Sequence, residues 1–80
     1  MSYGYSARTI QLNKAADHRR LGVALGRAAI ELGVPVSAVA NFLGVSRQTV
    51  YNWFVGSYDP KASLTGEATN LLIRFRKKLK

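Results

Sequence analysis

The chain has 80 residues, with twelve Lys and Arg against four Asp and Glu, so its formal net charge is +8. This length allows one small domain with a single modest core. The absence of Cys and the presence of one His exclude a disulfide framework and a zinc finger. No apolar run approaches the roughly twenty residues of a membrane-spanning helix, and the N-terminus lacks a secretory pattern. We therefore expect a cytoplasmic protein with no cofactor and no membrane partner.

The basic excess indicates a polyanionic partner. Nucleic acid is the commonest polyanion for a basic intracellular domain, because neutralising phosphates releases condensed counterions. Charge alone does not separate nucleic-acid binding from simple solubility, so a local motif has to decide between them.

The first thirteen residues contain Tyr3, Tyr5 and Ile10 but no helical stripe of apolar residues. They predict an N-terminal arm over residues 1–13, followed by the domain proper over residues 14–80. Three structures remain open for the arm: an extension that is disordered or packed down, a segment that pairs with a second subunit, and an arm that tracks a DNA groove.

A helix is predicted from Lys14 to about Leu32, where Gly33 ends it. Its apolar residues recur at helical spacing and form one inward stripe: Leu21, Leu25, Ala28 and Leu32. Gly22 and Gly26 lower the local helix propensity, but their spacing of four places both on one face. This spacing predicts that another helix passes close to them.

Residues 35–56 contain two short helical patterns joined by a sharp turn. The apolar residues of the first pattern share one face: Val36, Val39, Ala40 and Leu43. Gly44 ends this pattern, because glycine adopts a left-handed conformation at low cost. Ser46 is a good N-cap for the second pattern, which runs over about residues 47–55 and turns Trp53 inward.

A polar loop containing Pro60 separates this motif from a last predicted helix, which begins near Ser63 or Thr65. The apolar residues of this helix lie on one side: Leu64, Ala68, Leu71, Leu72, Phe75 and Leu79. Basic residues gather toward its end: Arg74, Arg76, Lys77, Lys78 and Lys80. Cations there suit the negative end of the helix macrodipole.

Six residues of the motif resemble, in type and spacing, the helix-turn-helix of the phage lambda-repressor and Cro-like family: Ala40, Gly44, Val45, Ser46, Val50 and Trp53. The resemblance extends outward, because Trp53, Gly56 and Pro60 are similar to the Trp-x-x-Gly-x-x-x-Pro ending of that family. Upstream, the stripe over residues 21–32 resembles the family's first helix. The resemblance covers roughly residues 21–64, about half of the chain.

This resemblance implies an all-α, lambda-repressor-like helix-turn-helix domain of about four helices with an N-terminal arm. Two positions depart from the family: Val36 stands where the second helix often begins with Gln, and Phe54 stands where Glu often follows the Trp. These departures affect one phosphate contact of the family and one polar interaction of its recognition helix, which corresponds to the second helix of the motif. Because the family often has a further helix at the end, we expect the apolar side of the last helix to be partly uncovered in one subunit and covered in a homodimer.

The second helix of the motif turns five polar residues outward: Arg47, Gln48, Thr49, Tyr51 and Asn52. Arg can bond guanine O6 and N7 with two donors, and Gln or Asn can pair with adenine N6 and N7. The resemblance implies base contacts by Arg47, Gln48 and either Tyr51 or Asn52. Contacts to phosphate are expected from another set: Ser37, Ser46, Thr49, Tyr58 and Lys61. The alternative is an ordinary solvated face.

The sequence therefore predicts a sequence-specific double-stranded DNA-binding transcriptional regulator, a repressor of phage or mobile-element type that binds as a homodimer in a bacterial cell or nucleoid. The alternative is a small basic phage-like adaptor or inhibitor that binds a host protein such as the transcription machinery. A third alternative is nucleoid coating without sequence preference.

Enzymatic activity is not expected, because the four carboxylates are scattered over separate elements. A DNA-binding segment of a recombinase would show the same motif, but the initial Met favours a complete regulator.

Overall fold

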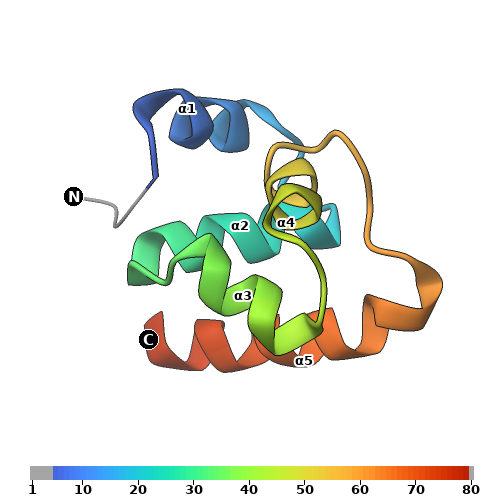
Figure 1. The fold of residues 1–80 in the computed structure, drawn as a ribbon. Helices are drawn as coiled ribbons and strands as arrows, with labels where there is room; N and C mark the ends of the chain where they lie inside the picture. Colours follow the sequence, from blue (N-terminus) through green and yellow to red (C-terminus); the bar gives the residue numbers. More distant parts are fainter. Residues whose placement is uncertain (1–4, 80) are drawn as a thin grey trace.

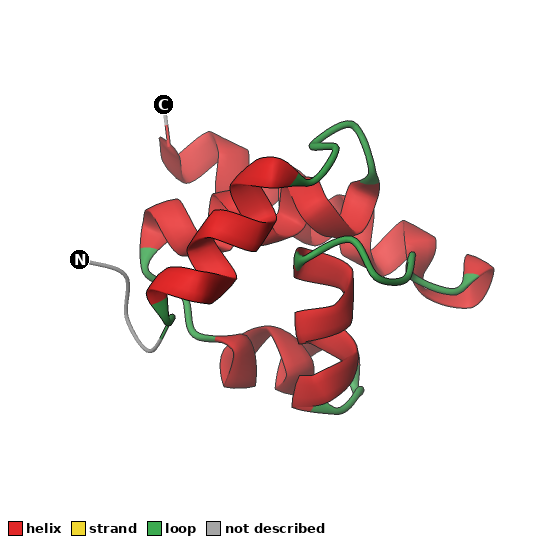
Figure 2. Ribbon diagram, turned by 90° about the horizontal axis from the view of Figure 1, so that it is seen from above, coloured by secondary structure: helices red, strands yellow, loops and turns green. Residues whose placement is uncertain are grey.

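The computed structural model describes residues 5–79, which form helices and loops without any strand in this range. The helices are α1 (Ala7–Ala15), α2 (Leu21–Leu32), α3 (Val36–Leu43), α4 (Arg47–Phe54) and α5 (Ala62–Leu79). Figure 1 shows α1 and α5 on opposite sides of α2, with α3 and α4 beside it. Seen from above, the longest connection joins α4 to α5 (Figure 2). The predicted all-α fold is confirmed, although the described chain has five helices rather than about four.

The N-terminal part differs from the prediction. Residues 7–15 form a helix instead of continuing an arm through residue 13, and the single helix predicted over residues 14–32 is divided. Asp17 divides it, because its carboxylate accepts a 3.0 Å hydrogen bond from the backbone N–H of Arg19 and fixes a turn. The sequence of this helix has no apolar stripe, because its buried residue is polar, Asn13. Tyr3 lies outside the described residues.

Asn13 and Tyr5 attach α1 to the rest of the domain. The Asn13 side-chain amide donates to the carbonyl oxygens of Val23 at 3.1 Å and Phe54 at 2.7 Å. The Tyr5 hydroxyl donates to the carbonyl oxygen of Val34 at 2.7 Å, and its ring stacks on Phe54 at a centroid distance of 6.3 Å. The described N-terminal segment is therefore part of the core.

The predicted close approach at Gly22 and Gly26 is confirmed, and the neighbouring helix is α4. A Cβ atom at Gly22 would lie 2.8 Å from the Trp53 Cβ, and one at Gly26 would lie 2.6 Å from the Phe54 Cγ. Trp53 and Phe54 are both buried. Phe54 thus fills the space that Gly26 leaves beside α2. The lambda-repressor family often has Glu at this position.

The turn between α3 and α4 follows the predicted chemistry. Gly44 ends α3 with a φ of 70°, a conformation that is costly for a residue with a side chain. The Ser46 hydroxyl accepts a 3.2 Å hydrogen bond from the backbone N–H of Thr49 and caps α4. The helix-turn-helix over residues 36–54 is therefore confirmed to within a residue of its predicted boundaries.

Most of the apolar side of α5 is covered within one chain, although Leu64 is half-buried and Leu79 is 40% exposed. Its buried residues are Ala68, Leu71, Leu72 and Phe75. They belong to the same apolar core as α2 and α3, and α5 packs chiefly along α2. The uncovered part of this side is thus confined to the two ends of the helix, and the homodimer stays a prediction.

Candidate nucleic-acid interface

Helix α4 turns its apolar residues inward and its polar residues outward. Val50, Trp53 and Phe54 are buried, which directs the side at Gln48 and Asn52 away from the core. Arg47 and Gln48 are exposed, and Asn52 is half-buried. The structure therefore places all four predicted base-reading residues on α4, with Arg47 and Gln48 exposed.

The side chains of Gln48 and Asn52 are joined, because the Gln48 Nε2 donates to the Asn52 Oδ1 at 3.1 Å. They stand one helical turn apart, the spacing at which side chains on a helix meet. This bond uses one N–H of the Gln48 side chain and one acceptor position of the Asn52 Oδ1. The Gln48 side-chain oxygen and the Asn52 side-chain N–H groups take no part in it. The pair offers both donors and acceptors, the combination that base edges require.

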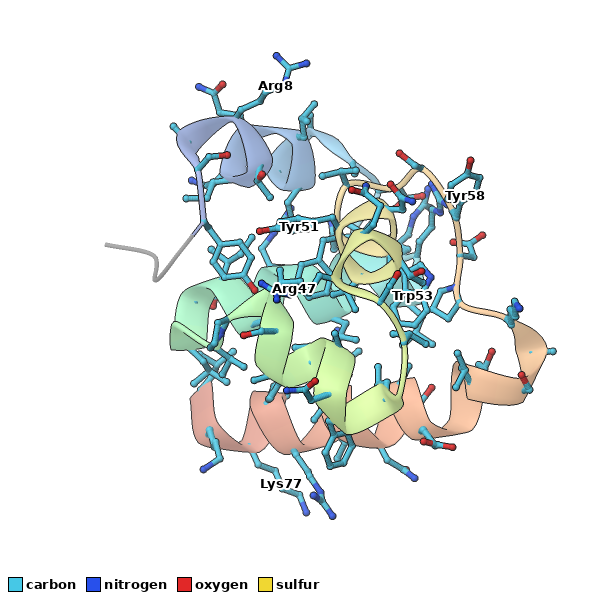
Figure 3. The ribbon with its side chains drawn as sticks, in the orientation of Figure 1. Arg8, Arg47, Tyr51, Trp53, Tyr58 and Lys77 are labelled. Atoms are coloured by element: carbon cyan, nitrogen blue, oxygen red, sulfur yellow. The ribbon has the colours of Figure 1, made fainter. Side chains whose placement is uncertain are left out.

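Tyr51, the fourth predicted base reader, lies one turn after Arg47 on α4. It is half-buried and packs against the apolar core. The pKa of the nearby Tyr5 phenol is raised, chiefly by burial and secondarily by Tyr51. In Figure 3, Tyr51 lies on the opposite side of α4 from Tyr58. Because part of its ring is committed to packing, Tyr51 has less surface for a base than was expected.

A cavity of about 500 Å³ lies between α4, the loop after it and the start of α5. The cavity is lined by Val45, Ser46, Thr49, Asn52, Trp53, Tyr58, Asp59, Lys61 and Leu64. Four of the five predicted phosphate-binding residues are thus brought together around one hollow, beside one predicted base reader. Ser37, the fifth, lies half-buried in the first turn of α3 and does not line the cavity. Arg47, Gln48 and Tyr51 also lie outside it.

Two hydroxyl groups form one wall of this cavity. The Ser46 Oγ and the Thr49 Oγ1 lie 2.8 Å apart and share a hydrogen bond. Ser46 also caps α4, so this wall is fixed to the first turn of the helix. A hydroxyl oxygen has one donor and two acceptor positions, so the pair retains capacity for another partner.

The loop that forms the opposite wall is held by Arg20. The Arg20 Nη1 donates to the carbonyl oxygen of Gly56 at 2.7 Å, and its Nη2 lies 2.8 Å from an Asp59 carboxylate oxygen. The backbone N–H of Ser57 donates to the carbonyl oxygen of Asn52 at 2.8 Å. Arg20 therefore positions the segment that carries Tyr58 and Lys61. Sequence reasoning missed this residue, because nothing local connects Arg20 with Asp59.

The electrostatics of this side of the domain favour an anion. Neither α3 nor α4 carries a carboxylate. Asp59 at the cavity is paired with Arg20. Elsewhere, hydrogen bonds from Arg19 hold the pKa of Asp17 at about 2, so this carboxylate is also paired. Arg47 and Lys61 are both exposed.

Neither a metal site nor a membrane-spanning helix is found among the described residues. Among residues 5–79, no set of three His, Asp or Glu side chains has an arrangement suited to a metal ion. Within the same residues, none of the helices combines the length and the apolar character that crossing a membrane requires.

The helical fold agrees with a comparison against known families. Residues 15–55 match a family model described as a homeodomain-like domain, and this segment contains α2, α3 and α4. No curated protein and no solved structure matches the chain significantly. The match supports the helix-turn-helix DNA-binding class without specifying the lambda-repressor and Cro-like type. Because the matched segment spans just over half of the 80 residues, the chain belongs to the homeodomain-like helix-turn-helix family.

Proposed function

We propose that this chain is a sequence-specific double-stranded DNA-binding transcriptional regulator that reads an operator through the major groove. The observation that carries the proposal is the outward face of α4, with Arg47 exposed and Gln48 bonded to Asn52. In homeodomains the third helix of the domain lies in the major groove. Helix α4 is the third helix of the matched segment.

Base reading is assigned chiefly to Arg47, Gln48 and Asn52. Arg47 can hold guanine O6 and N7 with two donors, and the joined amides suit adenine N6 and N7. Each good bidentate contact contributes roughly 1–3 kcal/mol of discrimination between bases. Tyr51 takes a smaller share, because its ring is partly packed against the core.

Phosphate binding is assigned to the cavity beside α4. Its ammonium group comes from Lys61 and its hydroxyl groups from Ser46, Thr49 and Tyr58. Ser37 adds a contact at the start of α3, where backbone N–H groups are free of intrahelical partners. Such contacts fix the position of the domain on the duplex and add affinity, but they carry no sequence information.

The finer proposal is a repressor of phage or mobile-element type, similar to the lambda-repressor and Cro-like proteins, that acts in the bacterial cytoplasm or nucleoid. A homodimer would place two α4 helices in major grooves about 34–36 Å apart, one turn of DNA, and add affinity that one small module does not supply. Occupation of the operator would exclude polymerase from the same DNA. The proposed action is binding alone, with no catalysis and no cofactor.

Selection of binding sites from random duplex DNA at about 0.15 M salt tests the proposal, because this salt suppresses purely electrostatic association. An enriched inverted repeat is the expected result. Strong binding without an enriched sequence would replace the regulator by a DNA-coating protein. Absence of binding would contradict the DNA-binding function itself.

Variants of α4 and α5 separate sequence reading from charge. Arg47→Ala and Gln48→Ala are expected to relax the preference at one position each, at a cost of about 1–3 kcal/mol. Lys77→Ala removes a charge from α5, and Figure 3 shows this residue on the side of α5 turned away from α4. It should weaken all sequences alike or have no effect. Equal losses on every sequence from all three variants would contradict operator reading.

A further inference from the structure

An apolar groove lies between α3 and α5, separate from the cavity beside α4. Its lining is entirely apolar: Val34, Ala38, Val39, Phe42, Leu71 and Phe75. The hollow measures about 170 Å³. An apolar cavity of about 150 Å³ can hold benzene, so the groove has room for one aromatic or branched aliphatic side chain. Phe42 forms one wall and is 53% exposed, so its ring is available to a ligand.

The rim of the groove is cationic. The Arg74 guanidinium lies over the Phe42 ring at 5.8 Å from its centroid. Lys78 follows one turn later on the same side of α5 and is exposed. The one carboxylate of α5, Glu67, is seven residues before Arg74, or about 10 Å along the helix axis. Among the described residues, no carboxylate lines the groove or pairs with Arg74.

The groove and the proposed DNA-binding residues occupy different sides of α3. Ser37 and Phe42 are five residues apart, which places them about 140° from each other around the helix. The groove is also lined by α5, whereas the cavity beside α4 shares no lining residue with it. A ligand in the groove therefore leaves the polar face of α4 accessible.

We propose that this groove binds an acidic amphipathic segment of a partner protein. One apolar side chain of the partner fills the hollow, and flanking carboxylates pair with Arg74 and Lys78. Charge-assisted hydrogen bonds from a guanidinium to a carboxylate are among the stronger ones, and amphipathic helices commonly bind in apolar grooves. The inference does not depend on DNA binding.

The chemistry of the rim and floor opposes other occupants. A second copy related by a two-fold axis would bring an equally cationic rim, with no carboxylate in the lining, into the same interface, and like charges repel. The phosphates of DNA would gain nothing from the apolar floor. Only a partner with both an apolar side chain and negative charge satisfies the lining and the rim together.

The test uses the full chain and a short synthetic amphipathic helix with Leu on one face and Glu on the other. Binding is measured by fluorescence polarisation of the labelled peptide, and its location by amide chemical shifts of the isotope-labelled protein. We expect saturable binding with the largest shifts around residues 38–42 and 71–78. Phe42→Ala and Arg74→Glu should each weaken it by at least about tenfold, equivalent to about 1.4 kcal/mol.

Variants on α1 serve as controls, because α1 carries an exposed apolar residue and an exposed arginine on another surface. Leu12→Ala removes a side chain that is 43% exposed, and Arg8→Glu makes the same charge change as Arg74→Glu. Neither should alter peptide affinity. Helical circular dichroism of each variant checks that the domain is folded, and because Arg74 is exposed, its variant is expected to pass even if Phe42→Ala does not.

Several results would overturn the proposal. Equal losses from Arg8→Glu and Arg74→Glu would mean unlocalised charge attraction. Equal binding of a peptide with Ala in place of Leu would mean that the hollow is not used, and equal binding of one with Lys in place of Glu would mean that the rim is not. Absence of binding would remove the site. Self-association of the protein that Phe42→Ala abolishes in sedimentation would assign the groove to a second copy.

Discussion

The side-chain amide of Asn13 donates a 2.7 Å hydrogen bond to the carbonyl oxygen of Phe54, joining the end of α1 to the last residue of α4. A carbonyl at a helix end lacks an intrahelical partner, and Asn13 supplies one inside the core. The Arg27 Nε in turn donates to the Asn13 Oδ1 at 3.3 Å, so the buried amide is bonded at both ends. The end of α4 is therefore held by a residue outside the helix-turn-helix.

Asn13→Ala should destabilise the domain by about 1–3 kcal/mol, because it leaves the buried Phe54 carbonyl without a partner. Chemical unfolding monitored by circular dichroism measures this change. Asn41→Ala is the control, since Asn41 is exposed on α3 and its loss should stay within about 0.5 kcal/mol. Equal effects of the two substitutions would mean that the amide does not stabilise the fold.

Gly26→Ala and Gly66→Ala should change stability in opposite directions. The Cβ at Gly26 would lie 2.6 Å from the Phe54 Cγ, so this substitution should destabilise by about 1–3 kcal/mol through overpacking. A Cβ at Gly66 meets nothing within 4 Å, so alanine there should stabilise α5 by about 0.5–1 kcal/mol. Thermal unfolding of both variants tests the close crossing of α2 and α4, and stabilisation by Gly26→Ala would contradict it.

Arg20→Lys should reduce the free energy of DNA binding by more than it reduces the free energy of unfolding. Lysine cannot bond the Gly56 carbonyl and the Asp59 carboxylate with the same fork of donors, so the loop carrying Tyr58 and Lys61 loses its fixed position. Because the ion pair is partly exposed, the stability loss should remain below about 1 kcal/mol. Affinity for the selected operator and unfolding midpoints are measured together.

Arg19→Lys is the matched control for this prediction, because Arg19 pairs with Asp17 in solvent and does not contact the loop. It should leave DNA affinity unchanged. An operator affinity for Arg20→Lys equal to that of the unaltered protein would show that the loop needs no support from this residue.

Tyr5 should make the fold sensitive to alkaline pH. Burial raises the pKa of its phenol above the ordinary value of 10.0. The folded state therefore favours the neutral phenol. The stability that this preference contributes is fully present below about pH 10 and is lost as the pH rises above it. Unfolding measured across this range should show stability falling with pH.

Tyr5→Phe should reduce this pH dependence, although it also removes the hydrogen bond to Val34 at a cost of about 1 kcal/mol at neutral pH. Tyr58→Phe should change neither quantity, because Tyr58 is 64% exposed. An unchanged alkaline slope in Tyr5→Phe would assign the sensitivity to another group.

The sequence by itself determined the helix-turn-helix. Gly44 and Ser46 act through their own backbone conformation and the next few residues, and the apolar stripes of α3 and α4 lie within single helices. Such signals are local, so they can be recognised without knowing the fold. The outward position of Arg47 and Gln48 followed from the same periodicity, while their roles in base reading stay predictions.

Only the tertiary structure decided what surrounds this motif. The bond between Asn13 and Phe54 joins residues 41 positions apart, and the bond between Arg20 and Asp59 joins residues 39 apart. Neither pair has a local pattern, because a side chain's partner across the core depends on how the helices pack. For the same reason α1 was missed, the cavity around Lys61 emerged only in three dimensions, and the extent to which α2 and α3 cover the apolar side of α5 could not be predicted.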